Sequence, residues 1–214
     1  MSRPSLRQFR GLAAAVAVAA CAIVPALRAT IVGLNQIATP EIQPNGVLSL
    51  SFQGEHPAIG NSQQVQLELG VTPRFEVAWF QGLKPSEGLF STEFNLVQSG
   101  PHLLTVGALN WDTLGGRPQP VVEYGYYTDR DHLIAGVIDV VGHAETILGY
   151  KRQLTNTVAF STDFQSGPGN SFTVGLTYNL TPDFSLNPAL YWTNSSKRHL
   201  LGYIVLTYNF TVWK

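Results

Sequence analysis

The last third of the chain contains three segments in which apolar and small polar residues alternate almost without error. In residues 172–180 every second position is apolar, and threonine, glycine or asparagine lies between. Residues 184–193 and 200–213 repeat the pattern after short turns. Successive side chains of a β-strand point to opposite faces, so each segment is predicted to be a strand with one apolar and one polar face. Such strands fit a membrane barrel or a soluble sandwich that buries one face.

Similar runs, bounded by clusters of Gly, Pro, Asn and Asp, extend back to residue 46. These clusters are typical of the turns between strands. After residue 29 no apolar run has the length of a transmembrane helix, so any membrane crossing is predicted to be made by strands. Twelve strands are predicted, near residues 46–53, 63–71, 75–81, 89–98, 102–110, 120–127, 132–141, 146–153, 157–165, 171–180, 184–193 and 200–213.

The predicted connections alternate between tight turns, such as residues 72–74 and 181–183, and mostly longer glycine-containing loops, such as residues 54–62 and 142–145. Short turns at one end and longer loops at the other are typical of outer-membrane barrels. The sequence therefore predicts an all-β fold, a transmembrane up-and-down antiparallel β-barrel of about 12 strands over residues 46–214.

The N-terminus has the pattern of a secretory signal peptide, here residues 1–29. Three arginines precede an Ala- and Val-rich run at residues 11–27. Cleavage after Ala26 or after Ala29 stays open, and so does lipidation of Cys21, which follows a short lipobox-like sequence. Residues 30–45 contain two prolines and no regular period, and they are predicted to be an extended periplasmic arm.

Charge and cysteine content exclude several classes of function. Four of the 13 basic residues lie in residues 1–29, whereas all 14 acidic residues follow that segment. The remaining chain is therefore acidic and has no basic cluster, which argues against a nucleic-acid partner. No cysteine follows Cys21, so the exported chain has neither a disulfide nor a thiolate nucleophile.

Ionisable residues within the predicted strands fall mainly on the polar face. A charge facing lipid at mid-depth is costly, so this face is predicted to line the lumen. One interpretation is an acidic lumen that passes cations or polar solutes, and the other is a plugged interior in which the carboxylates are bonded and pass nothing. The candidate lumen-lining residues are Glu68, Glu76, Glu93, Glu123, Asp139, Lys151 and Asp163, with Arg152 as the alternative to Lys151.

The sequence contains no motif for a cofactor, and its histidines lack metal-ligand spacing. His56, His143 and His199 are predicted to lie on the longer loops with several serines, so an outer-membrane lipid hydrolase is a further hypothesis. A nucleophile-elbow motif is absent, and the chain is not expected to be an enzyme. The tryptophans and tyrosines near strand ends are predicted to form interfacial girdles.

Residues 175–182 and 201–210 resemble the closing strands of small outer-membrane barrels, namely porin-like transporters that include the type associated with phenol degradation. The resemblance covers residues 46–214. It implies a passive channel or transporter for small solutes in the outer membrane of a diderm bacterium, with outer-membrane lipid and the barrel-assembly machinery as partners. Such barrels usually end on an outward aromatic residue, but this chain has Lys214 there, so either the assembly signal is tolerant or Phe210 and Val212 carry it.

Overall fold

The computed structural model describes residues 33–84, 86–112, 116–195 and 199–213. The predicted signal peptide, Cys21 and Lys214 lie outside the described residues. Within the described ranges, no helix is long and apolar enough to cross a membrane.

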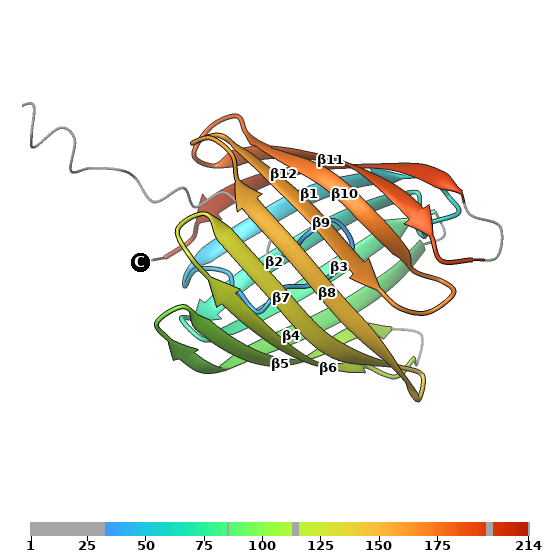
Figure 1. The fold of residues 1–214 in the computed structure, drawn as a ribbon, viewed down its shortest axis with the longest axis horizontal. Helices are drawn as coiled ribbons and strands as arrows, with labels where there is room; N and C mark the ends of the chain where they lie inside the picture. Colours follow the sequence, from blue (N-terminus) through green and yellow to red (C-terminus); the bar gives the residue numbers. More distant parts are fainter. Residues whose placement is uncertain (1–32, 85, 113–115, 196–198, 214) are drawn as a thin grey trace, which may run out of the picture.

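Twelve antiparallel strands form one closed barrel, in which every strand pairs with its neighbours in sequence and β1 pairs with β12 (Figure 1). This confirms the predicted fold class and strand number. The strands are β1 (Val47–Glu55), β2 (Gln63–Thr72), β3 (Phe75–Leu83), β4 (Ser86–Ser99), β5 (His102–Asp112), β6 (Gln119–Tyr127), β7 (Asp131–Val140), β8 (His143–Gln153), β9 (Val158–Gln165), β10 (Ser171–Asn179), β11 (Phe184–Thr193) and β12 (Leu200–Thr211).

The two ends of the barrel differ. At the turn end, where β1 begins and β12 ends, two to four residues connect successive strands. At the loop end, the first, third, fifth and sixth connections have five to seven residues. Two connections there are shorter than predicted, because β3 and β4 extend to Leu83 and Ser86 and because β7 and β8 are joined by two residues alone.

The alternation predicted for the last strands is present in the barrel wall. In β10 the burial alternates at every residue, and Thr173 and Thr177 on the polar face are buried whereas Phe172 is 44% exposed. Apolar side chains of the other face form an exposed band around the barrel, which is the surface that a transmembrane barrel presents to lipid. Members of this band include Leu50, Phe52, Leu67, Phe94, Leu96, Val122, Leu133, Val137, Leu148, Phe172, Leu190, Ile204, Leu206 and Phe210.

The aromatic residues divide between the two faces. Trp111, Trp192 and Tyr126 are exposed near strand ends, where interfacial girdles are expected. Tyr191 and Tyr203, which the sequence assigns to the same girdles, instead lie on the inward face, and Tyr191 is only 1% exposed. Odd-numbered residues of β11 and β12 face inward, so both tyrosines pack inside the barrel with Ala189 and Leu201.

Pro188 occupies an outward position in β11, where it interrupts the ladder with β10. Pairing is present at Gly175 with Ala189 and again at Tyr178 with Leu186, but not between. The register is unchanged across the gap, so the proline causes a local break rather than a bulge. A hydrogen bond of 2.9 Å from Asn187 Nδ2 to Thr177 Oγ1 joins the two strands there.

The two-residue turn between β7 and β8 has both φ angles positive, 55° at Val141 and 83° at Gly142. These are the signs of a type I′ hairpin turn, which favours asparagine or glycine at both positions. Val141 is a β-branched residue in this conformation and is 83% exposed, so its side chain has little packing to offset the strain.

Replacing Val141 with asparagine is therefore expected to stabilise the barrel by about 1 kcal/mol, because asparagine tolerates the left-handed conformation. Denaturant unfolding of the refolded protein in lipid vesicles measures the change. Leu154→Asn is the control, because Leu154 is also exposed in a connection but has no positive φ. An unchanged or lower stability of Val141→Asn would contradict the strain.

Residues 33–45 lie inside the barrel, not outside it as the sequence predicts. Leu34, Asn35, Ile37 and Gln43 are all buried, with 1–8% exposure. In Figure 1 the blue stretch before β1 runs between the front and back strands. We call residues 33–45 the inner arm. Its position follows from its contacts with the wall, which no periodic pattern in the arm itself could have indicated.

Candidate functional site

The candidate site is the lumen, where four glutamates gather on the inward face. Glu68 on β2, Glu76 on β3, Glu93 on β4 and Glu123 on β6 are 0–5% exposed. Glu76 and Glu93 are directly opposite each other in the ladder between β3 and β4. The sequence predicts this inward placement from alternation alone, because each glutamate lies on the parity opposite the apolar band. Their role in passing a solute stays a prediction.

Glycines on the neighbouring strands leave room for two of these side chains. Gly107 pairs with Glu93, and a Cβ atom at Gly107 would lie 2.9 Å from Glu93 Cγ. Gly136 pairs with Glu123, and a Cβ atom there would lie 3.1 Å from Glu123 Cγ. Both distances are shorter than normal van der Waals contact, so a larger residue would push the carboxylates out of place.

The carboxylates of this group are incompletely bonded. Both oxygens of Glu123 and Oε1 of Glu93 are buried without a hydrogen-bond partner among the described residues. Glu76 accepts a hydrogen bond of 2.5 Å from the backbone N–H of Gln43 in the inner arm. Ionising a buried carboxylate without donors is costly, so a cation or a hydrogen-bond donor beside these oxygens would stabilise their charged form.

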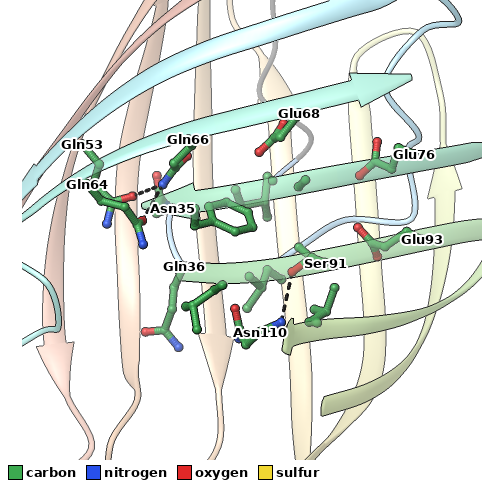
Figure 2. Close-up of a pocket in the computed structure, with 18 of the residues that line it drawn as sticks. Asn35, Gln36, Gln53, Gln64, Gln66, Glu68, Glu76, Ser91, Glu93 and Asn110 are labelled. Atoms are coloured by element: carbon green, nitrogen blue, oxygen red, sulfur yellow. Dashed lines mark hydrogen bonds between the residues drawn. The ribbon is translucent and has the colours of Figure 1, made fainter. Parts of the chain in front are cut away.

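Amide side chains continue the polar wall toward the loop end. Gln66 Nε2 donates to Gln53 Oε1 at 2.5 Å and to Gln64 Oε1 at 2.9 Å. Gln53 Nε2 donates to Glu55 Oε2 at 3.0 Å. Figure 2 shows the three glutamines on one side of a hollow, with Glu68, Glu76 and Glu93 at its other end. The polar side chains of β1 and β2 thus continue toward the loop end, whereas Phe80 of β3 and Leu89 of β4 also line this hollow.

Lys151 and Asp163 are also on the inward face, as the sequence predicts, and they are 8% and 2% exposed. The alternative base, Arg152, faces outward and pairs with Asp131 at 3.2 Å. Asp163 accepts hydrogen bonds from the backbone N–H groups of Asn35 at 2.7 Å and Gln36 at 3.3 Å. Asp163 therefore binds the inner arm rather than lining open space.

The placement of Asp139 in the lumen is wrong. Asp139 is exposed, and its Oδ1 accepts a hydrogen bond of 2.6 Å from the N–H of Gly142, so it caps the turn after β7. The inward positions of β7 are taken by Ile134 and Ile138. The prediction failed because β7 is apolar on both faces, so the alternation of polar and apolar residues did not show which face of the strand points inward.

The inward apolar residues of β6 to β8 cover the inner arm. Val121, Ile134, Ile138 and Ile147 form one buried cluster with Leu34 and Ile37 of the arm. Gly149 lies beside this cluster, and a Cβ atom there would come within 2.7 Å of Leu34 Cδ1 and 2.9 Å of Ile37 Cδ1. The wall is therefore shaped to receive these two side chains.

Polar contacts hold the arm to the other strands. Asn35 Nδ2 donates to Thr173 Oγ1 at 3.0 Å, and Ser161 Oγ donates to Asn35 Oδ1 at 3.1 Å. Tyr191 OH donates to the carbonyl oxygen of Asn35. Thr105 Oγ1 donates to the carbonyl oxygen of Pro40 at 2.8 Å. The arm thus interacts with strands around the whole circumference, a set of contacts that the sequence did not reveal.

Two of the hollows between the described residues lie beside the arm. The carboxylate hollow, about 250 Å³, lies between the arm and β1 to β4 and is lined by Glu68, Glu76 and Glu93. The loop-end hollow, about 840 Å³, is lined by β7, β8 and residues 165–170. Gln36, Ile37 and Ala38 of the arm line both hollows, so the tip of the arm lies where they meet.

The described histidines make local contacts. Within the described ranges, no group of three or more His, Cys, Asp or Glu residues is arranged to hold a metal ion. His56 Nδ1 accepts a hydrogen bond of 3.2 Å from the N–H of Ala58, two residues away in the same loop. His102 stacks against Tyr124 with ring centroids 6.0 Å apart, on the outer surface.

Comparison with solved structures shows that the barrel is similar to porins in its fold. The NanC porin superposes with a TM-score of 0.54 at 10% identity, over 75% of this chain and 98% of that chain. The chain has a porin barrel fold. The KdgM porin, described in complex with disordered oligogalacturonate, gives a TM-score of 0.55 at 8% identity, over 77% of this chain and 99% of that chain. No protein-family model matches the sequence, and no curated protein matches it.

The similarity to these two porins is one of fold. Both porins are covered almost completely, whereas about a quarter of this chain is unmatched. Neither is described as an enzyme. What passes through this barrel has therefore to be argued from the residues of its own lumen.

Proposed function

We propose that the protein is an outer-membrane channel through which small polar or cationic solutes pass passively. The apolar outer band supports a position in a membrane, and the closed barrel with a polar interior supports an aqueous route through it. The porin fold agrees with both. The diderm outer membrane is the expected location, because an exported chain that spans with strands belongs there.

The observation that carries this proposal is the group of inward glutamates. Glu68, Glu76 and Glu93 line a hollow, and Glu123 nearby has two unpartnered carboxylate oxygens. Rings of acidic side chains give cation preference in channels. Lys151 is the one basic residue among the predicted lumen-lining side chains, and it is outnumbered by the carboxylates.

The acidic lumen also argues against one class of solute. The KdgM porin is described with an oligogalacturonate, which is an anionic oligosaccharide. A polyanion entering this barrel would meet Glu68, Glu76, Glu93 and Glu123 without a compensating basic cluster in the described wall. Repulsion between like charges in a region of low dielectric makes that entry unfavourable. We therefore propose cations and neutral polar molecules.

Assembly into the membrane is proposed to use the last strand. Phe210 lies on the lipid-facing side of β12 and is 43% exposed, next to Tyr208 with ring centroids 4.6 Å apart. This outward aromatic pair is the feature that the barrel-assembly machinery is proposed to recognise in place of a terminal aromatic residue. Outer-membrane lipid is the proposed partner of the apolar band.

Conductance of the refolded protein in a planar bilayer tests the proposed function. We expect discrete channels in potassium chloride, with a reversal potential under a salt gradient that indicates cation preference. Heat-modifiable migration in detergent gels serves as the control that the barrel has folded. A folded barrel that shows no conductance, with the inner arm present or absent, would reject the channel.

A further inference from the structure

We propose that the inner arm is a displaceable plug, and that its release from the wall opens the lumen of the channel. This proposal rests on the proposed channel function and concerns the regulation of the same lumen. In the structure the arm is bound inside, which corresponds to the restricted state. Its displacement would leave the glutamates and both hollows in one continuous passage.

The arm crosses the lumen from one side to the other. Gln43 binds Glu76 on β3, and Asn35 binds Asp163 on β9. In the closed ring of twelve strands, β3 and β9 are six strands apart in either direction, so they lie on opposite sides. A segment that touches both must pass through the central space. Because Gln36, Ile37 and Ala38 line both hollows, the arm tip divides them.

The arm is held by contacts that can be exchanged without breaking the barrel. Its backbone groups bind side chains of the wall, namely Asp163, Glu76, Thr105 and Tyr191. Water in an open lumen can replace each of these hydrogen bonds at small net cost. The strand ladders stay complete, because the bridge from Asn45 to Gly70 is the one β-bridge between the described part of the arm and a strand.

The apolar part of the wall is a built binding surface for the arm. Val121, Ile134, Ile138 and Ile147 face inward, where an open lumen would expose them to water. Leu34 and Ile37 cover them in the structure. The absence of a side chain at Gly149 provides the space into which both arm residues pack. The wall thus binds the arm through an apolar surface whose shape fits Leu34 and Ile37.

A tight turn lies between the arm and β1. Gly46 has a φ of 74°, and its N–H donates to the carbonyl oxygen of Gly70 at 2.8 Å. The N–H of Val47 donates to the carbonyl oxygen of Pro44 at 2.9 Å, which closes a tight turn. The chain reverses here from β1 into the lumen, so a change at this turn moves the arm while β1 stays paired.

The main test uses Ile37→Asp in the full-length chain. Ile37 is 3% exposed in an apolar cluster, and a buried unpaired charge there favours the displaced arm. No strand residue is altered, so the barrel is expected to fold. Single-channel conductance is expected to rise severalfold over that of the unaltered protein. Leu154→Asp is the matched control, because it also replaces an apolar residue with aspartate but lies exposed in the turn between β8 and β9, away from the arm.

A second variant displaces the arm from the side of the wall. Gly149→Leu fills the space used by Leu34 and Ile37 and is expected to raise conductance in the same direction. Gly202→Leu is its control, because Gly202 has no atom within 4 Å of the added Cβ. Heat-modifiable migration is measured for all four variants to establish that each barrel has folded.

Arm position is followed independently of conductance by thiol labelling. Leu34→Cys is introduced with Cys21→Ser, so that the arm carries the single thiol of the chain. Leu34 is 8% exposed, so a water-soluble maleimide is expected to react slowly with the cysteine. Adding Gly149→Leu is expected to accelerate the labelling severalfold, whereas adding Gly202→Leu is expected to leave it unchanged.

The outcomes separate the two proposals. Conductance that rises in Ile37→Asp and Gly149→Leu, with faster labelling, supports the plug. Channels of equal conductance in all variants would overturn the plug and leave the channel in place. Folded variants with faster labelling but no conductance would instead reject the channel.

Discussion

Replacing Leu206 with arginine is expected to lower the free energy of unfolding of the barrel in lipid by about 2–4 kcal/mol. Leu206 lies in the middle of the lipid-facing band, where a charged side chain is most costly. Leu206 is 39% exposed and pairs with Phe52 on β1 and Leu186 on β11, both of which are on the same face. None of these neighbours offers the guanidinium a hydrogen-bond acceptor. Reversible unfolding by guanidinium chloride in lipid vesicles measures the effect.

Leu200→Arg is the matched control for depth. Leu200 has the same outward parity in β12 and is 57% exposed, but it lies at the loop end of the strand. A charge near the interface costs about 0–1 kcal/mol, so the two variants are expected to differ clearly. Equal stability of the two proteins in lipid would contradict the position of the band at mid-depth, and with it the membrane location of the barrel.

Neutralising Glu93 and Glu123 together, as Glu93→Gln and Glu123→Gln, is expected to remove most of the cation preference of the channel. Two charges about 4 Å apart interact by about 1 kcal/mol even in bulk water, so each carboxylate beside a passing cation contributes about fivefold. The ratio of cation to anion permeability, obtained from the reversal potential under a salt gradient, is expected to fall by at least that factor.

Asp129→Asn and Asp183→Asn together form the control for this measurement. Both aspartates are exposed in turns at the turn end, outside the lumen, and their removal changes the total charge by the same amount. Bulk salt screens charges at the surface, so the permeability ratio is expected to change little. A similar fall in both double variants would show that the lumenal glutamates do not select the ion.

The fold was predictable where one face of each strand is apolar and the other polar. In β10 the buried face consists of serine, threonine, glycine and asparagine, so the inward side of each position follows from its parity. The same reasoning placed Glu68, Glu76, Glu93 and Glu123 inside. It failed in β7, where Ile134 and Ile138 face inward and Leu133 and Val137 face outward, so both parities are apolar.

The inner arm could not be placed from the sequence, because residues 33–45 have no period and satisfy their backbone groups through side chains of distant strands. Its hydrogen bond to Asp163 joins residues 128 positions apart. The apolar inward face of β7 was nevertheless a signal. Inward isoleucines in a water-filled lumen would be exposed to water unless an apolar segment covers them, and Leu34 and Ile37 supply that segment.

The course of the arm also changes how the two ends of the chain are connected. The ladder between β1 and β12 closes the barrel and joins positions as distant as Val47 and Thr211. Asn35, which lies shortly before β1, binds Ser161, Thr173 and Tyr191 on β9, β10 and β11. The arm therefore connects β1 to the last quarter of the chain through contacts that do not involve the ladder between β1 and β12. These contacts keep β1 at a high effective concentration near β12 whenever that ladder opens.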